Sequence, residues 1–249
     1  MVGAYSEGGE GILELAGCLS DAAENDLEGG VRLQHGDGWG LAVLTEDGLI
    51  IYRSGRPIYE ERPDVLSLLR GKRTLVIIHA RLASEKSKVG PQYSHPYLAT
   101  SMDGSLTYIL AHNGSVRKRP LVDDEDLLPP GLTSDEYVDS ELIALYLAKW
   151  GLSGESLSRL QKYVTPGSAV NLLVIEISRS RRIAALQAYS HWDAAANGEY
   201  YRLYKVEAGG TRAIVSSTVA RECKRRGWEE ISALEAGRIE SVGELRLVG

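Results

Sequence analysis

Four short polar clusters carry the residue types that could do chemistry, and each lies at the end of a predicted strand or helix. They read HGDGWG at residues 35–40, HARLAS at 79–84, AHNG at 111–114 and VDSE at 138–141. An amide beside a glycine can stabilise an oxyanion through N–H groups, and a planar guanidinium can hold a carboxylate through two parallel hydrogen bonds. Polar groups at such ends are where a rigid scaffold presents chemistry.

The strands that must position these clusters are predicted from apolar runs and turn residues. Residues 40–45 and 49–53 flank an Asp-Gly pair that favours a tight turn, which predicts a β-hairpin. Nearly continuous apolar and β-branched runs at 74–80 and 105–111 predict buried strands. Further strands are expected at 170–177, 183–189, 200–206 and 212–216.

One long helix is predicted before the second half of the chain. Thr133 and Glu136 form a capping-box pattern, and Gly151 is a C-terminal stop, so the helix is expected to run to Trp150. Asp139 and Trp150 then share one face, with Asp139 near the helix start. Shorter helices are expected at 156–163 and 219–226, and surface loops at 83–96 and 117–131.

The order of these elements bears on the fold class. Strands, then helices, then more strands, without regular βαβ alternation, disfavour a doubly wound parallel sheet. A mixed or antiparallel layered α/β fold is predicted instead. The chain has 249 residues and lacks internal repeats or a Pro/Ser-rich linker, which favours one domain.

Composition excludes several classes of protein. The chain is 43% hydrophobic and 25% charged, as in globular proteins, and its net charge of -6 favours neither nucleic acid nor an anionic membrane as partner. Without a membrane-length apolar run or a signal peptide, it is expected to be cytoplasmic. Cys18 and Cys223 are expected to be reduced. Few Met and Cys, no Phe and many Arg suit a heat-loving source.

The clusters, taken in order, resemble the class II glutamine amidotransferases, which are N-terminal-nucleophile hydrolases that release ammonia from glutamine. More narrowly, the chain resembles the small stand-alone members of that group, and the likeness covers almost the whole chain. The resemblance implies an α+β fold, a four-layer αββα sandwich of two mostly antiparallel sheets. It also implies that residues 1–249 form a single glutamine amidotransferase type 2 domain. The matching segments are 35–40, 79–83, 95–97, 111–114, 138–141 and Trp228.

The resemblance assigns roles to four residues. Asn113 and Gly114 form the oxyanion hole, Arg81 binds the α-carboxylate of glutamine, and Asp139 accepts from its α-ammonium group. Each residue also has a purely structural alternative. Asn113 and Gly114 could form a turn between strands, Arg81 a strand-end ion pair, and Asp139 a favourable charge at a helix N-terminus.

The remaining polar residues of the motifs are expected to support the pocket. In the resembled family the histidines mostly buttress loops and strand ends, and Trp39 is expected to be a packing residue. The histidines could instead bind zinc together with Asp37, but their spacing matches no strong ligand pattern. No metal and no cofactor are therefore expected. The predicted supporting residues are His79, His95, His112, Asp37 and Trp39, and Ser84 and Tyr97 are further candidates for the lining.

The nucleophile of the resembled family is a cysteine that becomes the first residue after methionine removal. Its free α-amine then serves as the base for its own thiol. Relatives begin Met-Cys-x and continue with two apolar residues and Gly, so Met1, Val2 and Gly3 match the last three positions. We therefore predict a start codon upstream of Met1. A chain that begins at Met1 is expected to bind glutamine weakly or not at all, and not to hydrolyse it.

Three functions remain open from the sequence. The first is a glutaminase of the amidotransferase type, whose ammonia acceptor is a separate subunit or a small molecule. The second is a homologue without a nucleophile that acts as a glutamine-sensing or assembly module. The third is a metal-dependent hydrolase built on the histidines. An internal thiol such as Cys18 is a poor substitute nucleophile, because its amine is tied into a peptide bond.

Overall fold

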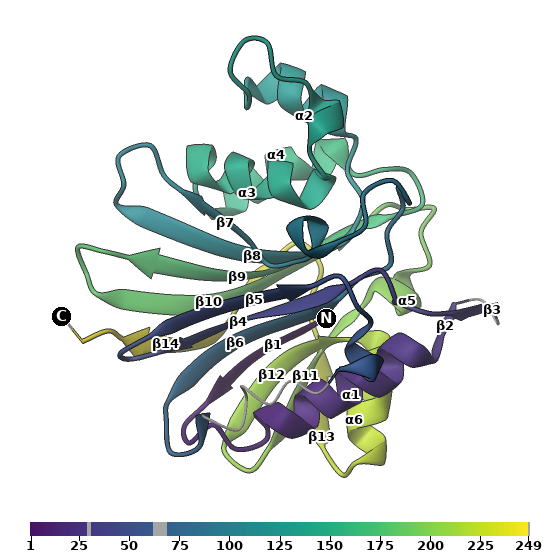
Figure 1. Cartoon of the computed structure of the whole chain (residues 1–249), viewed down its shortest axis with the longest axis vertical. Coiled ribbons are helices and arrows are strands. Elements are labelled where there is room, and N and C mark those ends of the chain that lie inside the picture. Colours follow the sequence, from purple (N-terminus) through teal and green to yellow (C-terminus); the bar gives the residue numbers. More distant parts are fainter. Residues whose placement is uncertain (29–30, 62–68, 249) are drawn as a thin grey trace.

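The computed structural model of the chain describes residues 1–28, 31–61 and 69–248. Two antiparallel sheets stack face to face, and helices cover the outer face of each sheet, giving four layers (Figure 1). This confirms the predicted α+β fold, the αββα layer order and the antiparallel pairing of the strands. Among the described residues, no helix is both long and apolar enough to cross a membrane.

The first sheet has seven strands in its described part, in the order β13-β11-β12-β1-β6-β4-β5. Two helices, α1 (Ile12–Glu24) and α6 (Ser217–Arg225), pack against its outer face and bury an apolar core there. The strands are β1 (Val2–Ser6), β4 (Trp39–Thr45), β5 (Leu49–Ser54), β6 (Thr74–Ala80), β11 (Leu203–Ala208), β12 (Thr211–Ser216) and β13 (Glu229–Ala233).

The second sheet has five strands in the same described ranges, in the order β14-β10-β9-β8-β7. Its outer face is covered by α2 (Lys118–Glu125), α3 (Asp139–Trp150) and α4 (Gly154–Leu160). Its strands are β7 (Tyr97–Thr100), β8 (Leu106–Gly114), β9 (Ala169–Ser178), β10 (Ile183–Trp192) and β14 (Ile239–Arg246). A two-stranded ribbon of β2 (Asp26–Glu28) and β3 (Val31–Leu33) and a short helix α5 (Gly198–Tyr201) lie outside the two sheets.

Alternation along each strand decides which side chains face the space between the sheets. In β6, Leu75 and Ile77 lie in the core between the sheets, whereas Val76 and Ile78 pack in the core under α1 and α6. Odd-numbered residues of β6 therefore face the second sheet. The same holds for β1 and β8, whose odd-numbered apolar residues also lie between the sheets.

Most of the predicted strands are confirmed, including the hairpin of β4 and β5 and the buried strands β6 and β8. The long helix starts later than expected, because the Thr133 capping box opens a short 3₁₀ turn (Ser134–Glu136) and α3 begins at Asp139. Gly151 ends α3 as predicted, but Trp150 is 43% exposed and so lies off the buried face. Residues 117–131, expected to be a loop, contain α2.

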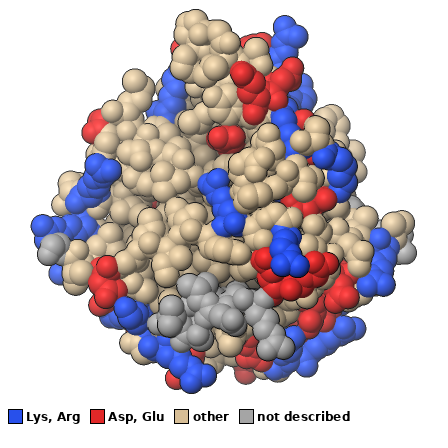
Figure 2. Space-filling model, viewed as in Figure 1, with Lys and Arg blue, Asp and Glu red and all other residues tan. Residues whose placement is uncertain are grey.

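Charged side chains on the face drawn in Figure 2 lie mainly around its margin, with both signs interspersed. The middle of this face, over β4, β5 and the strands of the second sheet, is largely uncharged. The face therefore carries no large area of a single charge.

Candidate functional site

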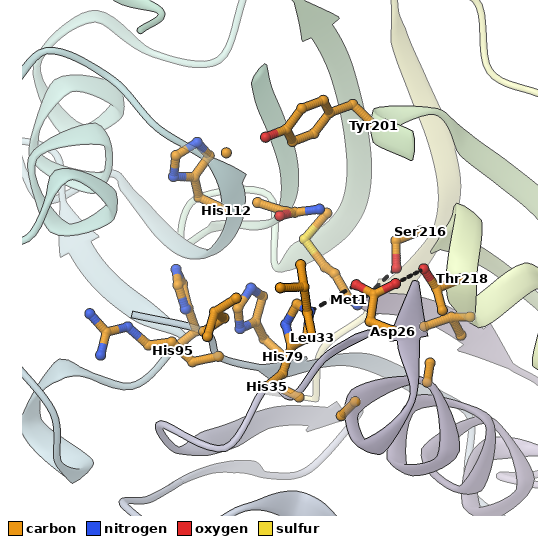
Figure 3. Close-up of a pocket in the computed structure, with 18 of the residues that line it drawn as sticks. Met1, Asp26, Leu33, His35, His79, His95, His112, Tyr201, Ser216 and Thr218 are labelled. Atoms are coloured by element: carbon orange, nitrogen blue, oxygen red, sulfur yellow. Dashed lines mark hydrogen bonds and ion pairs between the residues drawn. The ribbon is translucent and has the colours of Figure 1, made fainter. Parts of the chain in front are cut away.

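A cavity of about 310 Å³ lies at one end of the sandwich, where β1 begins and where β6 and β8 end (Figure 3). It brings together the four residues for which the sequence suggested a substrate or oxyanion role. Met1 and three of the predicted supporting histidines also line it. These residues are Arg81, Asn113, Gly114, Asp139, Met1, His79, His95 and His112.

The strand alternation explains why residues so far apart in sequence meet here. Met1, His79 and Asn113 each continue the odd-numbered series that faces the space between the sheets. Met1 begins the strand that pairs with β6, and Ile78, beside His79, lies opposite Val2 in that pairing. Two strands of the first sheet and one of the second therefore direct side chains into the same space.

Arg81 lies one residue beyond β6 and is nearly buried, with 8% of its surface exposed. Its Nη1 donates to the Lys88 carbonyl oxygen at 2.6 Å, and its backbone carbonyl accepts from the Asp37 N–H at 3.0 Å. A guanidinium has five N–H donors. In the described part of the chain, the hydrogen bond to the Lys88 carbonyl oxygen is the one that the Arg81 guanidinium makes. Donors therefore remain for a carboxylate in the cavity.

Asp139 is the first residue of α3 and is partly buried. Its Oδ1 accepts from the Ser140 N–H at 2.8 Å, and its Oδ2 accepts from the Val116 N–H at 3.2 Å. The first bond is the ordinary interaction of a carboxylate with a helix N-terminus. The second fixes the carboxylate against the segment that follows β8, so the group is held beside the end of that strand.

Asn113 and Gly114 are the last two residues of β8 and pair with Asn171 and Val170 of β9. They therefore continue the strand, and the alternative of a turn between strands is wrong. The structure also gives a reason for the glycine that the sequence did not supply. Gly114 has φ 131°, and a Cβ there would lie 1.9 Å from the Ala169 carbonyl oxygen. Glycine is required by the neighbouring backbone, whatever the ligand.

We predict that Gly114→Ala lowers the free energy of unfolding by about 4 kcal/mol or more, because the added carbon collides with backbone. Gly131→Ala is the matched control, since Gly131 has φ 95° and open space around it. That change should cost only about 1 to 2 kcal/mol of backbone strain. Urea denaturation of both variants measures the difference. Equal losses would contradict the steric reason.

Three histidines of the cavity wall, His79, His95 and His112, are buried and uncharged at neutral pH. The rings of His79 and His95 stand 4.0 Å apart between centroids, and burial holds the pKa of each well below its usual value. His112 shares a hydrogen bond of 3.0 Å between Nδ1 and the Ser140 hydroxyl, and burial lowers its pKa although Asp139 opposes this. Arg81 and Arg53 are cations close enough to His95 to lower its pKa further.

Two predicted supporting residues lie outside the cavity wall. Asp37 accepts from the Ala83 N–H at 2.8 Å and from Lys86 Nζ at 2.5 Å, so it ties its own loop to the loop after Arg81. Trp39 is buried in the core under α1, and its indole N–H donates to Glu61. Of the two further candidates for the lining, Ser84 lies in the wall, whereas Tyr97 packs behind it against His95.

The far side of the cavity carries a buried carboxylate that sequence reasoning missed. Asp26 lies close to Met1 (Figure 3) and accepts hydrogen bonds from Thr218 Oγ1 at 2.6 Å and from the Tyr200 hydroxyl at 2.8 Å. His35 Nε2 lies 2.9 Å from the same carboxylate. Burial raises the pKa of Asp26, but these bonds outweigh burial and hold that pKa at about 2. No local motif marks Asp26, because its partners come from distant elements.

Asp26→Asn is expected to lose pH-dependent stability. The folded pKa of about 2 lies below the value of about 3.9 in an unfolded chain, so the ionised group stabilises the fold by about 2 kcal/mol. This contribution is complete above about pH 4 and is lost as the pH falls through about 2. Urea denaturation at pH 7, 5 and 3 should show a difference in the free energy of unfolding between the native and variant proteins, and this difference should be smaller at pH 3. A constant difference would contradict the assignment.

Met1 lies where the two sides of the cavity meet. Its α-amine donates to the Ser216 hydroxyl at 3.2 Å, and its carbonyl oxygen accepts from the Ser216 N–H at 3.1 Å. Burial lowers the pKa of this amine to about 5, although Asp26 opposes the shift. In residues 1–28, 31–61 and 69–248, no group of three or more His, Cys, Asp or Glu side chains is placed to hold a metal ion.

No family model matches the chain. Solved structures share its fold, among them the following two. One is a glutamine phosphoribosylpyrophosphate amidotransferase from B. subtilis complexed with ADP and GMP, with a TM-score of 0.59, 16% identity, and coverage of 98% of this chain and 48% of that one. The other is titled the allosteric regulatory enzyme of purine biosynthesis, with a TM-score of 0.61, 20% identity, and coverage of 96% and 46%. The fold is thus that of N-terminal-nucleophile hydrolases.

A sequence relative points in the same direction over a shorter stretch. A Haemophilus influenzae protein named "Putative glutamine amidotransferase" is 28% identical over 117 residues, which is 47% of this chain and 37% of that protein. The chain spans less than half the length of each of these three proteins. The chain is thus similar to these proteins in fold and, over 117 residues, in sequence to a protein named as a glutamine amidotransferase.

Proposed function

We propose that the cavity binds glutamine and releases ammonia from its side-chain amide, with a cysteine that precedes Met1 as the nucleophile. One observation carries this proposal: Arg81 just after β6, Asn113 in β8 and Asp139 in α3 line one cavity beside the start of β1. The amidotransferase-like fold supports the same reaction class, although fold alone does not assign a reaction.

Glutamine offers a group for each of these side chains. Its α-carboxylate pairs with the Arg81 guanidinium, and its α-ammonium group with the Asp139 carboxylate. A cation and an anion in the wall of one polar cavity suit an amino acid zwitterion, because each charge of the ligand then has a partner of opposite sign. The side-chain amide is thereby directed toward the end of β8.

In the reaction, the cysteine thiolate attacks the carbon of the glutamine side-chain amide. Its own α-amine takes the thiol proton, and the attack places a negative charge on the amide oxygen. The Asn113 side-chain N–H and the Gly114 backbone N–H stabilise that oxyanion. The protonated α-amine gives its proton to the amide nitrogen, and collapse of the intermediate breaks the carbon–nitrogen bond, releases ammonia and leaves a thioester. Water then hydrolyses the thioester to glutamate and the free cysteine.

Three observations support a nucleophile two residues before Met1. With a period of two, that residue faces the space between the sheets, as Met1 does. Gly3, the glycine of the apolar-apolar-Gly pattern, lies where a Cβ would come 2.8 Å from the Leu173 side chain, so the sheets approach closely there. The Met1 amine is buried, and a peptide bond in its place would avoid burying a charge.

The role of Arg81 is tested with glutamine analogues, in a protein that begins with the cysteine. Arg81→Ala should lower kcat/KM for glutamine about 100-fold, as expected for removal of a buried charge partner. The same change should leave hydrolysis of 4-aminobutanamide, which lacks the α-carboxylate, almost unaltered. Asp139→Asn is the matched variant. It should lower kcat/KM for glutamine but leave hydrolysis of glutaramic acid, which lacks the α-amine, almost unaltered. Equal losses with all three amides would assign Arg81 and Asp139 a structural role.

A second candidate function is a glutamine-binding module without hydrolysis. It is favoured by the position of the two thiols, because Cys18 and Cys223 are fully buried under the first sheet, outside the cavity wall. Titration calorimetry of the chain that begins at Met1 separates the two candidates. Tight glutamine binding without ammonia release supports the module, whereas weak or absent binding supports the glutaminase.

The ammonia acceptor is proposed to lie outside residues 1–249, which we treat as a single glutaminase domain. The acceptor would be a separate subunit or a small molecule that reaches the cavity. Co-purification of the protein from its own cells, followed by mass spectrometry of bound proteins, tests for the subunit.

A further inference from the structure

Two thiols meet in the core between the first sheet and its helices. Cys18 belongs to α1 and Cys223 to α6, and both have 0% of their surface exposed. The two helices lie side by side and pack against each other (Figure 1). Both thiols belong to the same buried core cluster, and Cys18 is the first of the causes that raise the pKa of the Cys223 thiol. They are the two cysteines of the sequence, separated by 205 positions.

The residues around the thiols bring the two helices close together. A Cβ on Gly17, next to Cys18, would lie 3.0 Å from the Arg226 guanidinium. That guanidinium donates to Asp21 at 2.6 Å, so the residue three positions after Cys223 is bonded to the residue three positions after Cys18. The absent side chain at Gly17 and the ion pair therefore hold the segment of α1 around Cys18 beside the end of α6.

The thiol pair lies one helical turn behind the cavity wall. Ala22 follows Cys18 by four positions, and Val219 precedes Cys223 by four, so each lies on the same face of its helix as the cysteine. Both Ala22 and Val219 line the cavity. A covalent link between the cysteines would therefore fix the two helices that form this side of the cavity.

We propose that Cys18 and Cys223 form a disulfide that ties α1 to α6 behind the cavity wall when the chain folds in the presence of a disulfide oxidant. The step is thiol–disulfide exchange. The two thiols lose two protons and two electrons, one S–S bond forms between them, and the oxidant disulfide is reduced to two thiols. The inference depends on the helix packing and uses nothing of the glutamine site.

The surroundings of the pair determine when the bond can form. The neighbouring Cys18 side chain and the burial of Cys223 raise the pKa of the Cys223 thiol, and the thiolate is the reactive form. Exchange is therefore slow in the folded protein and proceeds during folding. The same burial shields the finished disulfide from reductants.

The test refolds the full chain from urea with glutathione disulfide or with reduced glutathione. After the first treatment we expect an intact mass two hydrogens lower, no alkylation of either cysteine in denaturant, and a melting temperature higher by on the order of 10 °C, because the link closes a long loop. Cys18→Ala and Cys223→Ala are matched variants and should melt at the same temperature under both treatments.

Two results would overturn the proposal. One is alkylation of both cysteines after oxidative refolding of the unaltered chain. The other is glutathione bound separately to each cysteine, since the thiols would then not reach each other. The thiol count in the unaltered chain keeps the test decisive even if an alanine variant fails to fold.

Discussion

A protein that carries Cys-Ala directly before Met1, with the cysteine as its first residue, is expected to release ammonia from glutamine, whereas the chain beginning at Met1 is expected to release none. The added cysteine shares the strand face of Met1, so its thiol is directed to the space between the sheets where Asn113 lies. Its free amine supplies the base. Ammonia and glutamate are measured together, and they should appear in equal amounts.

Two controls test whether this activity depends on the thiol and on the position of the added cysteine. A serine in place of the added cysteine should give little or no turnover, because a hydroxyl is a far weaker nucleophile than a thiolate. A cysteine placed one residue before Met1 should also be inactive, since alternation turns it to the opposite face of β1. Equal activity in the two cysteine registers would contradict the placement.

Asn113→Ala in the cysteine-bearing protein is expected to lower kcat about 100- to 1000-fold with little change in KM. The reason is that the Asn113 amide donates to a charge that exists only after attack. Single-turnover ammonia release measures the loss directly.

Asn113→Asp serves as the shape-matched comparison. It keeps the outline of the side chain but replaces the N–H donor with an oxygen, so it should lose as much activity as alanine. If the aspartate variant kept most of the activity, the side chain would act through packing instead. Melting temperatures of both variants should stay close to that of the parent.

Sequence reasoning succeeded where a local pattern determines the structure. The hairpin of β4 and β5 follows from its Asp-Gly turn, and β6 and β8 follow from their apolar runs. Asn113 and Arg81 could be selected because each lies at the end of such a run. The α1 helix was not predicted, since it follows Gly11, which has φ 78° and provides no side-chain cap.

Features created by tertiary contacts left no signal in the sequence. Asp26 lies between two other acids, Glu24 and Glu28, and its donors Tyr200 and Thr218 come from the other end of the chain. The requirement for glycine at 114 comes from the Ala169 carbonyl on a neighbouring strand. Contacts with backbone that is distant in the sequence arise only when the sheets form, so no local sequence pattern predicts them.

Covalent labelling tests the central claim most directly. The cysteine-bearing protein is incubated with a glutamine analogue whose side-chain amide is replaced by a diazoketone, and the labelled peptide is identified by mass spectrometry. The account predicts one label on the first residue, prevented by excess glutamine and lost in Arg81→Ala. Label on Cys18 or Cys223, or labelling that glutamine does not prevent, would contradict a glutamine site formed by Arg81, Asn113 and Asp139 at the start of β1.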